Sequence, residues 1–101
     1  MIALLADSVL ILSDVDRRDL WCAWVAQDAS QHAPDKEGKA YIMGMHYWFA
    51  GRLSGRHEGI SVNEEIGRLI FSPLPRPDSE ALNSCSAQFI KYQDADIRGQ
   101  N

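Results

Sequence analysis

The chain has 101 residues, of which 46% are hydrophobic and 24% are charged, so it can form one small core and is too apolar for a disordered tail. Its formal net charge of −4 argues against a nucleic-acid-binding protein, which needs clustered positive charge. No window reaches the roughly 18 apolar residues that a membrane span requires. We therefore expect a single domain over residues 1–101.

The first segment, residues 1–12, is apolar but ambiguous. It contains no Lys or Arg, and Asp7 interrupts its apolar run, so as written it is a poor signal peptide. The spacing of Ile2, Leu5, Val9 and Leu12 suits a helix, although the β-branched residues would also suit a strand. Three interpretations stay open: an apolar arm that packs on the rest, a first helix, and the remnant of a leader.

A helix is predicted from Ser13 or Asp14 to about Ser30, because either residue can cap it and acidic residues fill its first turn. Leu20 and Trp24 are expected on its polar side. At 100° per residue, the predicted core-facing residues are Val15, Cys22, Val25, Ala26 and Ala29.

After a break at residues 31–34, a second helix is predicted over about residues 35–54. It is apolar nearly all round, with a ridge of large residues on one side and with Gly44 and Gly51 on the other, flanked by Tyr47 and Trp48. Glycine weakens a helix, so two on one stripe indicate that a neighbouring backbone approaches there. We expect this to be the central helix, enclosed on all sides. The alternative is a groove between Tyr47 and Trp48 that receives a ligand or partner.

Two further helices are predicted. The capping box Ser61-Val62-Asn63-Glu64 starts a short helix that ends near residue 71 and buries Ile66, Leu69 and Ile70. Three prolines then form a stiff connector, and a last helix runs from residue 78 or 79 to about residue 93 or beyond, with Gly99 past its end and Cys85 on its apolar face. The fold class is all-α, a small bundle of four helices, or five if residues 1–12 form one.

The two cysteines project from the apolar faces of the first and last confident helices. We predict a Cys22–Cys85 disulfide, which would tie the two ends of the bundle together. The alternative is two buried free thiols. Since disulfides are rare in the cytosol, the bridge predicts a periplasmic or secreted protein, with a cytoplasmic one as the alternative.

No motif typical of an enzyme is present: the chain lacks a C-x-x-C pair, a phosphate-binding loop and a nucleophile elbow. We expect no enzyme and no cofactor.

His46 lies on an apolar helical face, where a hydrogen-bonded core histidine is expected rather than a ligand. The alternative is a zinc site formed by His46, Cys22 and Cys85. Asp14, Asp16 and Asp19 are explained by helix capping and solvation. Arg52 and Arg56 either stabilise a helix carboxyl end or bind an anion.

Three landmarks resemble those of the acid-activated periplasmic chaperones of the HdeA/HdeB type: Trp21-Cys22 in an early helix, the segment "GMHYWFAGRLSG", and "NSCSAQF" late in the chain. Small immunity proteins that neutralise secreted toxins share much the same outline. Only Cys22 and Cys85 carry over, as a bridging pair. The resemblance implies a protein that binds unfolding clients through apolar surface exposed in acid.

The expected function is a non-enzymatic binding protein of the bacterial cell envelope that contacts protein partners and can form a homodimer. The alternatives are a toxin-neutralising immunity or inhibitor protein and a small helical ligand-binding protein. The predicted partner or ligand surface consists of Trp24, Tyr47, Trp48, Arg52 and Arg56.

Overall fold

Four helices form the part of the chain that the computed structural model describes, residues 12–99, with side chains described up to residue 93. They are α2 (Asp14–Ser30), α3 (Lys36–Arg56), α4 (Val62–Ile70) and α5 (Ser79–Gly99). No strand occurs within these residues, so the prediction of an all-α bundle is confirmed. The arm, first helix or leader remnant expected at residues 1–12 lies, except for Leu12, outside the described residues.

The helices begin where polar side chains cap them. The hydroxyl of Ser13 accepts a hydrogen bond from the Asp16 amide, and the Asp16 carboxylate accepts one from the Ser13 amide, so α2 begins with a capping box. Asp35 accepts a bond from the Gly38 amide at the start of α3, and Ser61 caps α4. The turn between α3 and α4 uses Gly59 at φ +84°, a conformation that other residues rarely adopt.

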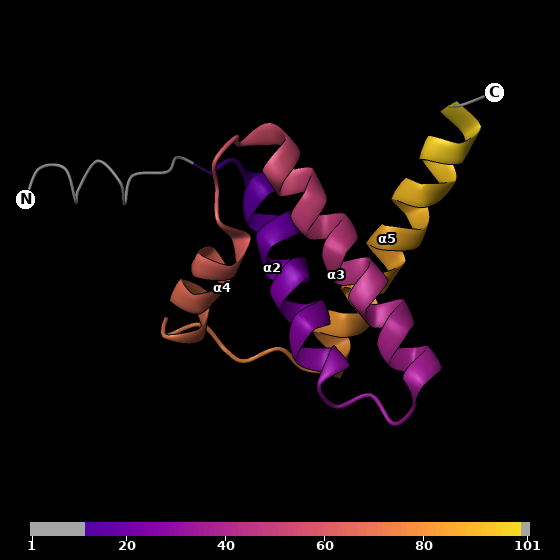
Figure 1. Cartoon of the computed structure of the whole chain (residues 1–101), viewed down its shortest axis with the longest axis horizontal. Coiled ribbons are helices and arrows are strands. Elements are labelled where there is room, and N and C mark those ends of the chain that lie inside the picture. The colour runs from indigo at the N-terminus through magenta and orange to yellow at the C-terminus, as the bar shows by residue number, and fades with distance from the viewer. Residues whose placement is uncertain (1–11, 100–101) are drawn as a thin grey trace, which may run out of the picture.

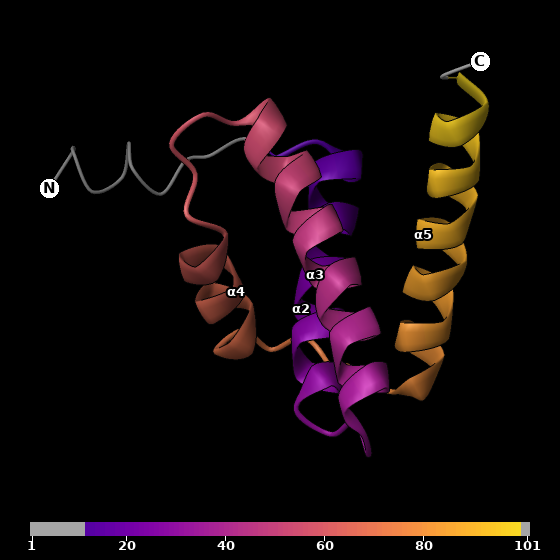
Figure 2. The same cartoon turned by 45° about the vertical axis from the view of Figure 1, so that its right-hand side comes forward.

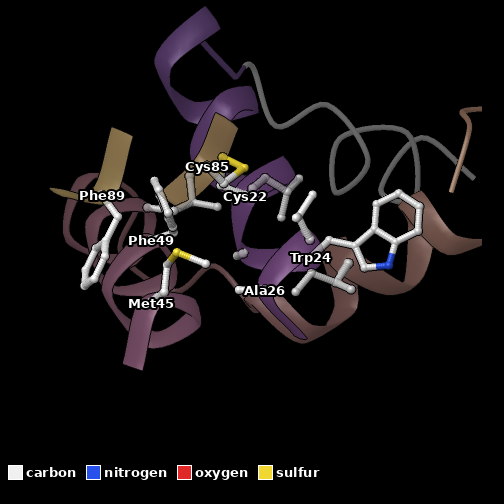
Figure 3. Packing of buried hydrophobic residues seen from close by; sticks show 12 residues of the cluster. Cys22, Trp24, Ala26, Met45, Phe49, Cys85 and Phe89 are labelled. Atoms are coloured by element: carbon white, nitrogen blue, oxygen red, sulfur yellow. A yellow bond between two sulfur atoms is a disulfide. The ribbon is translucent and has the colours of Figure 1, made fainter. Parts of the chain in front are cut away.

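Helix α2 is the centre of the bundle. It lies antiparallel beside α3, with α4 on one side of this pair and α5 on the other, as both views show (Figure 1 and Figure 2). Of the four helices, only α2 contacts each of the other three closely. Its side chains therefore fill the core in two directions: Trp24 points toward α4, whereas Cys22 points toward Cys85 of α5 (Figure 3).

The prediction that α3 would be enclosed on all sides is wrong. One face packs as expected, with Met45, Phe49 and Leu53 fully buried against α2. The opposite face is open: Gly44 and Gly51 are exposed, and a Cβ atom added at either position would have no neighbour within 4 Å. The reason lies in the arrangement of the helices, because α4 and α5 pack on the two sides of the α2–α3 pair and leave the outer face of α3 uncovered.

Replacing Gly44 or Gly51 with alanine is therefore expected to stabilise the protein by about 1 kcal/mol each, because helical glycine is disfavoured by that amount and the added methyl group meets no atom. Thermal or urea unfolding measures the change. The control is Gly59→Ala, which is expected to destabilise because its φ is +84°. A loss of stability in Gly44→Ala would mean that another surface covers this face.

The core face of α2 was also predicted only in part. Cys22, Val25 and Ala26 are buried as expected, but Val15 is exposed. Leu20 and Trp24 are buried although they were placed on the polar side. Because α4 covers a second side of α2, this helix has two apolar faces. The prediction assumed one apolar face, so it placed the residues of the second face on the polar side.

The predicted disulfide between Cys22 and Cys85 is confirmed. It joins the middle of α2 to α5, with a Cα–Cα distance of 5.5 Å, and both residues are 1% exposed (Figure 3). The alternative of two free thiols is wrong. The bond also leaves neither thiolate available for the zinc site that was considered. His46 is a core histidine, as expected: its Nδ1 donates to the carbonyl oxygen of Ala23 at 2.8 Å.

Candidate functional site

A cluster of charged side chains joins the beginning of α2 to the end of α3. Arg56 Nε donates to Asp16 Oδ1 at 2.6 Å, and His57 Nε2 donates to Asp16 Oδ2, also at 2.6 Å. Arg56 also pairs with Asp19, and Arg52 Nε lies 3.4 Å from Asp19 Oδ2. Both carboxylates are buried, at 3% and 1% exposed. We call Asp16, Asp19, Arg52, Arg56 and His57 the ionic cluster.

The ionic cluster corrects two predictions. Asp16 caps α2 as expected, but Asp16 and Asp19 are not solvated, because both are paired in the interior. Arg52 and Arg56 pair with these carboxylates, so they do not form the free anion-binding site that was one of the two predictions for them. The antiparallel packing of α2 against α3 brings the spaced acids of one helix next to the spaced arginines of the other. The i, i+3 and i, i+4 spacings were visible in the sequence, but the register of the two helices was not.

The cluster shifts the ionisation of its members. The hydrogen bond from His57 is the largest influence on Asp16, and with the bonds from Arg56 and Ser13 it outweighs the effect of burial, so the pKa of Asp16 lies far below its usual value of 3.8. Burial alone would lower the pKa of Arg56, but Asp19 and Asp16 outweigh burial and raise that pKa above its usual value. The cluster is therefore a charge-assisted link in which Asp16 keeps its charge well into the acid range.

Arg52 connects this cluster to an aromatic contact between α3 and α5. Its guanidinium lies 4.9 Å from the Trp48 ring centre and 4.8 Å from that of Tyr92, within the range of cation–π contacts. Trp48 also meets Phe89 edge to face at 5.2 Å. Trp48 and Arg52 therefore hold α5 against α3.

Two of the predicted surface anchors differ in their exposure. Trp24 is 3% exposed and packs edge to face on Trp21 at 5.2 Å, so the prediction that it forms part of a partner surface is wrong. Tyr47 is 65% exposed on the outer face of α3, beside His46. Of the predicted aromatic anchors, Tyr47 is the one that the structure leaves most accessible.

An apolar surface that was not predicted from the sequence lies at the end of α4. Ile70, Phe71 and Leu74 are 44%, 90% and 49% exposed, at the end of α4 and in the connector that follows. We call these three residues the α4 apolar surface. The prolines at positions 73, 75 and 77 cannot continue the helix, which ends at Ile70 and is followed by a turn and bends over residues 71–74. Ile70 had been expected in the core, and that prediction is wrong.

A groove of about 270 Å³ adjoins this surface, between the beginning of α2 and α4. Its walls are almost entirely apolar, and Leu74 belongs both to the groove and to the α4 apolar surface. The residues that line it are Leu12, Arg17, Leu20, Trp21, Glu65, Arg68, Leu69 and Leu74. We call it the α2–α4 groove.

Comparison of the chain with known proteins gave no match to a family model, to a curated protein or to a solved structure. Within residues 12–99, no helix is long and apolar enough to cross a membrane. In the same residues, no three His, Cys, Asp or Glu side chains are grouped so that they could hold a metal ion.

Proposed function

We propose that this chain is a non-enzymatic binding protein of the bacterial cell envelope that contacts other proteins through the α4 apolar surface. The observation that carries the proposal is the 90% exposure of Phe71, between the exposed side chains of Ile70 and Leu74. Exposed aromatic residues are favoured as the anchors of protein interfaces, and clustered apolar exposure is uncommon on monomeric proteins without a binding role.

The disulfide supports the proposed location. Cys22 and Cys85 are bonded in the core, and such bonds persist in oxidising compartments such as the periplasm or the exterior.

A stress chaperone of the HdeA/HdeB type is the version of this function that the sequence resemblance favours. In acid, the repulsion among ten Lys and Arg residues and three histidines would loosen the bundle, while the disulfide would keep it from dispersing.

Suppression of client aggregation at about pH 2–3 and at neutral pH tests the chaperone version. The full chain is expected to protect an aggregating client, and Phe71→Ser is expected to lose about half of the protection or more, because it removes the most exposed apolar side chain. Tyr47→Ser is the matched control, since it removes an exposed aromatic residue from a different helix. No protection at either pH, or equal loss in both variants, would contradict the proposal.

A second candidate is a toxin-neutralising immunity or inhibitor protein that uses Tyr47 as its anchor. The exposed ring of Tyr47 stands on the bare face of α3 between Gly44 and Gly51, where a partner could approach the backbone closely. Co-expression with a toxin-like protein encoded beside this one would test it, and Tyr47→Ala should abolish the rescue. A homodimer stays a prediction, to be decided by light scattering.

A further inference from the structure

The α2–α4 groove begins at the first residue that the structure describes. Leu12 belongs to its lining and is partly buried against the core, together with Trp21 of α2 and Leu69 of α4. Arg17 fixes the backbone at this point, because its Nη1 donates to the carbonyl oxygen of Leu12 at 2.8 Å. The chain therefore reaches the groove at Leu12, and residues 1–11 join it directly there.

The groove offers an occupant apolar contact and little else. Its walls are almost entirely apolar. The two arginines in the lining are paired within their own helices, Arg17 with Asp14 and Arg68 with Glu65, so the charges around the groove cancel. An occupant without charged groups fits it best, because a charge placed there would lose water without gaining a partner.

We propose that the groove is the docking site of the chain's own residues 9–11, which cover its apolar walls. Val9, Leu10 and Ile11 are three consecutive aliphatic residues that directly precede Leu12. At roughly 30 Å³ per methyl or methylene group, which is about the share of a water molecule in the liquid, a volume of about 270 Å³ holds about nine such groups, or two Leu or Ile side chains. The three residues therefore supply enough apolar volume to fill the groove.

Docking of this segment costs less free energy than the binding of a separate molecule. The segment is covalently joined to Leu12, so its docking is intramolecular and no second molecule loses its translational freedom. Burial of the aliphatic side chains favours the contact, whereas the ordering of three residues opposes it. These two contributions are of similar size, so the segment is a cover that can also open.

The docked segment sets one limit of the surface that is open to protein partners. Leu74 belongs both to the α4 apolar surface and to the groove, whereas Phe71 does not line the groove. The segment therefore covers the Leu74 end of the α4 apolar surface and leaves Phe71 open. The docking does not depend on the proposed function, because Phe71, which carries that function, lies outside the groove lining.

Nuclear Overhauser contacts in the full chain test the docking directly. The methyl groups of Leu10 and Ile11 are expected to show contacts with the indole of Trp21 and the methyl groups of Leu69. The double variant Leu10→Ser/Ile11→Ser should lose these contacts and shift the tryptophan emission to longer wavelength, because the indole of Trp21 then meets water. This shift should disappear when Trp21→Phe is added.

The double variant Leu4→Ser/Leu5→Ser is the matched control. It removes two aliphatic side chains of the same size from the same segment, but from residues further from Leu12, so the contacts and the emission should stay as in the parent. Phe71→Ser should also keep the contacts, so a loss of client protection in that variant concerns the proposed function alone. Circular dichroism is expected to show the helical content of the parent in every variant.

Four results would overturn the proposal. The first is the absence of contacts between residues 9–11 and the groove, and the second is an emission shift of equal size in both double variants. The third is contacts that arise only between differently labelled chains, which would mean that the groove receives this segment from a second copy. The fourth is loss of the contacts in Phe71→Ser, which would place the segment on the α4 apolar surface.

Discussion

Replacing both Cys22 and Cys85 with alanine is expected to lower the free energy of unfolding by about 4 kcal/mol. The bond closes a loop with a sequence separation of 63 residues, and the chain-entropy relation gives about this value for a loop of that length. A domain of this size has only about 5–15 kcal/mol in total. The double variant should therefore melt at a much lower temperature, and urea unfolding with and without reductant measures the difference.

The reductant supplies the control. It should destabilise the parent by about the same amount and leave the double alanine variant unchanged, because that variant has no bond to reduce. Alanine is preferred to serine, since both positions are 1% exposed and a buried hydroxyl without a partner would add its own penalty. A double variant as stable as the parent would show that the helices α2 and α5 hold together through their side chains alone.

Replacing Asp16 with asparagine is expected to lower the stability at neutral pH by about 3 kcal/mol, because it removes the charge of a buried carboxylate and leaves His57 without its carboxylate and Arg56 with Asp19 alone. The loss should shrink in acid. The pKa of Asp16 in the folded protein lies below its usual value of 3.8, so its stabilising contribution is complete well above 3.8 and is lost as the pH falls from there through the folded-state pKa.

The measurement is the difference in unfolding free energy between Asp16→Asn and the parent, taken from pH 7 down to pH 2. Asp14→Asn is the matched control, because the Asp14 side chain is 88% exposed and its surface pair with Arg17 should contribute less than about 1 kcal/mol. A difference that stays constant over this range would show that Asp16 acts through its shape and not through its charge. Because Asp16 holds its charge in acid, loosening of the bundle at low pH is expected to begin away from this cluster.

The helix boundaries and the disulfide could be predicted because their signals are local or pairwise. Ser61 and the prolines after Phe71 mark their helix ends through short-range chemistry, and Cys22 and Cys85 each stand on an apolar helical face. These signals do not depend on which helices become neighbours. The start of α2 at Ser13 was predicted for the same reason.

The arrangement of the helices could not be predicted, and most errors come from it. The apolar character of α3 indicated the centre of the bundle, but the centre is α2, which buries Trp24 toward α4 and Cys22 toward α5. Helical periodicity gives the directions of side chains around one axis and not the number of neighbours that surround it. The pairing of Asp16 with Arg56 could not be predicted for the same reason, since it depends on the antiparallel register of α2 and α3.

The exposed end of α4 was missed for a related reason. Ile70 and Phe71 continue an apolar helical pattern, which suggests burial, but only Ile66 of this nine-residue helix is fully buried. A short helix that packs with one side on the α2–α3 pair cannot bury all its apolar residues. The position of the connector, and not the sequence of the helix, decides which of them remain open to solvent.

The close pairing of α2 with α3 also has a consequence for the order of folding events. Only residues 31–35 separate these two helices, so their contacts are local along the chain and can form rapidly, whereas Cys85 must reach Cys22 from a distance of 63 residues. The α2–α3 hairpin should therefore assemble first and present Cys22 to α5. The disulfide then forms after α5 has packed on this hairpin. In kinetic refolding of the reduced chain, the gain of helix signal should precede the loss of free thiols, and the reverse order would refute this route.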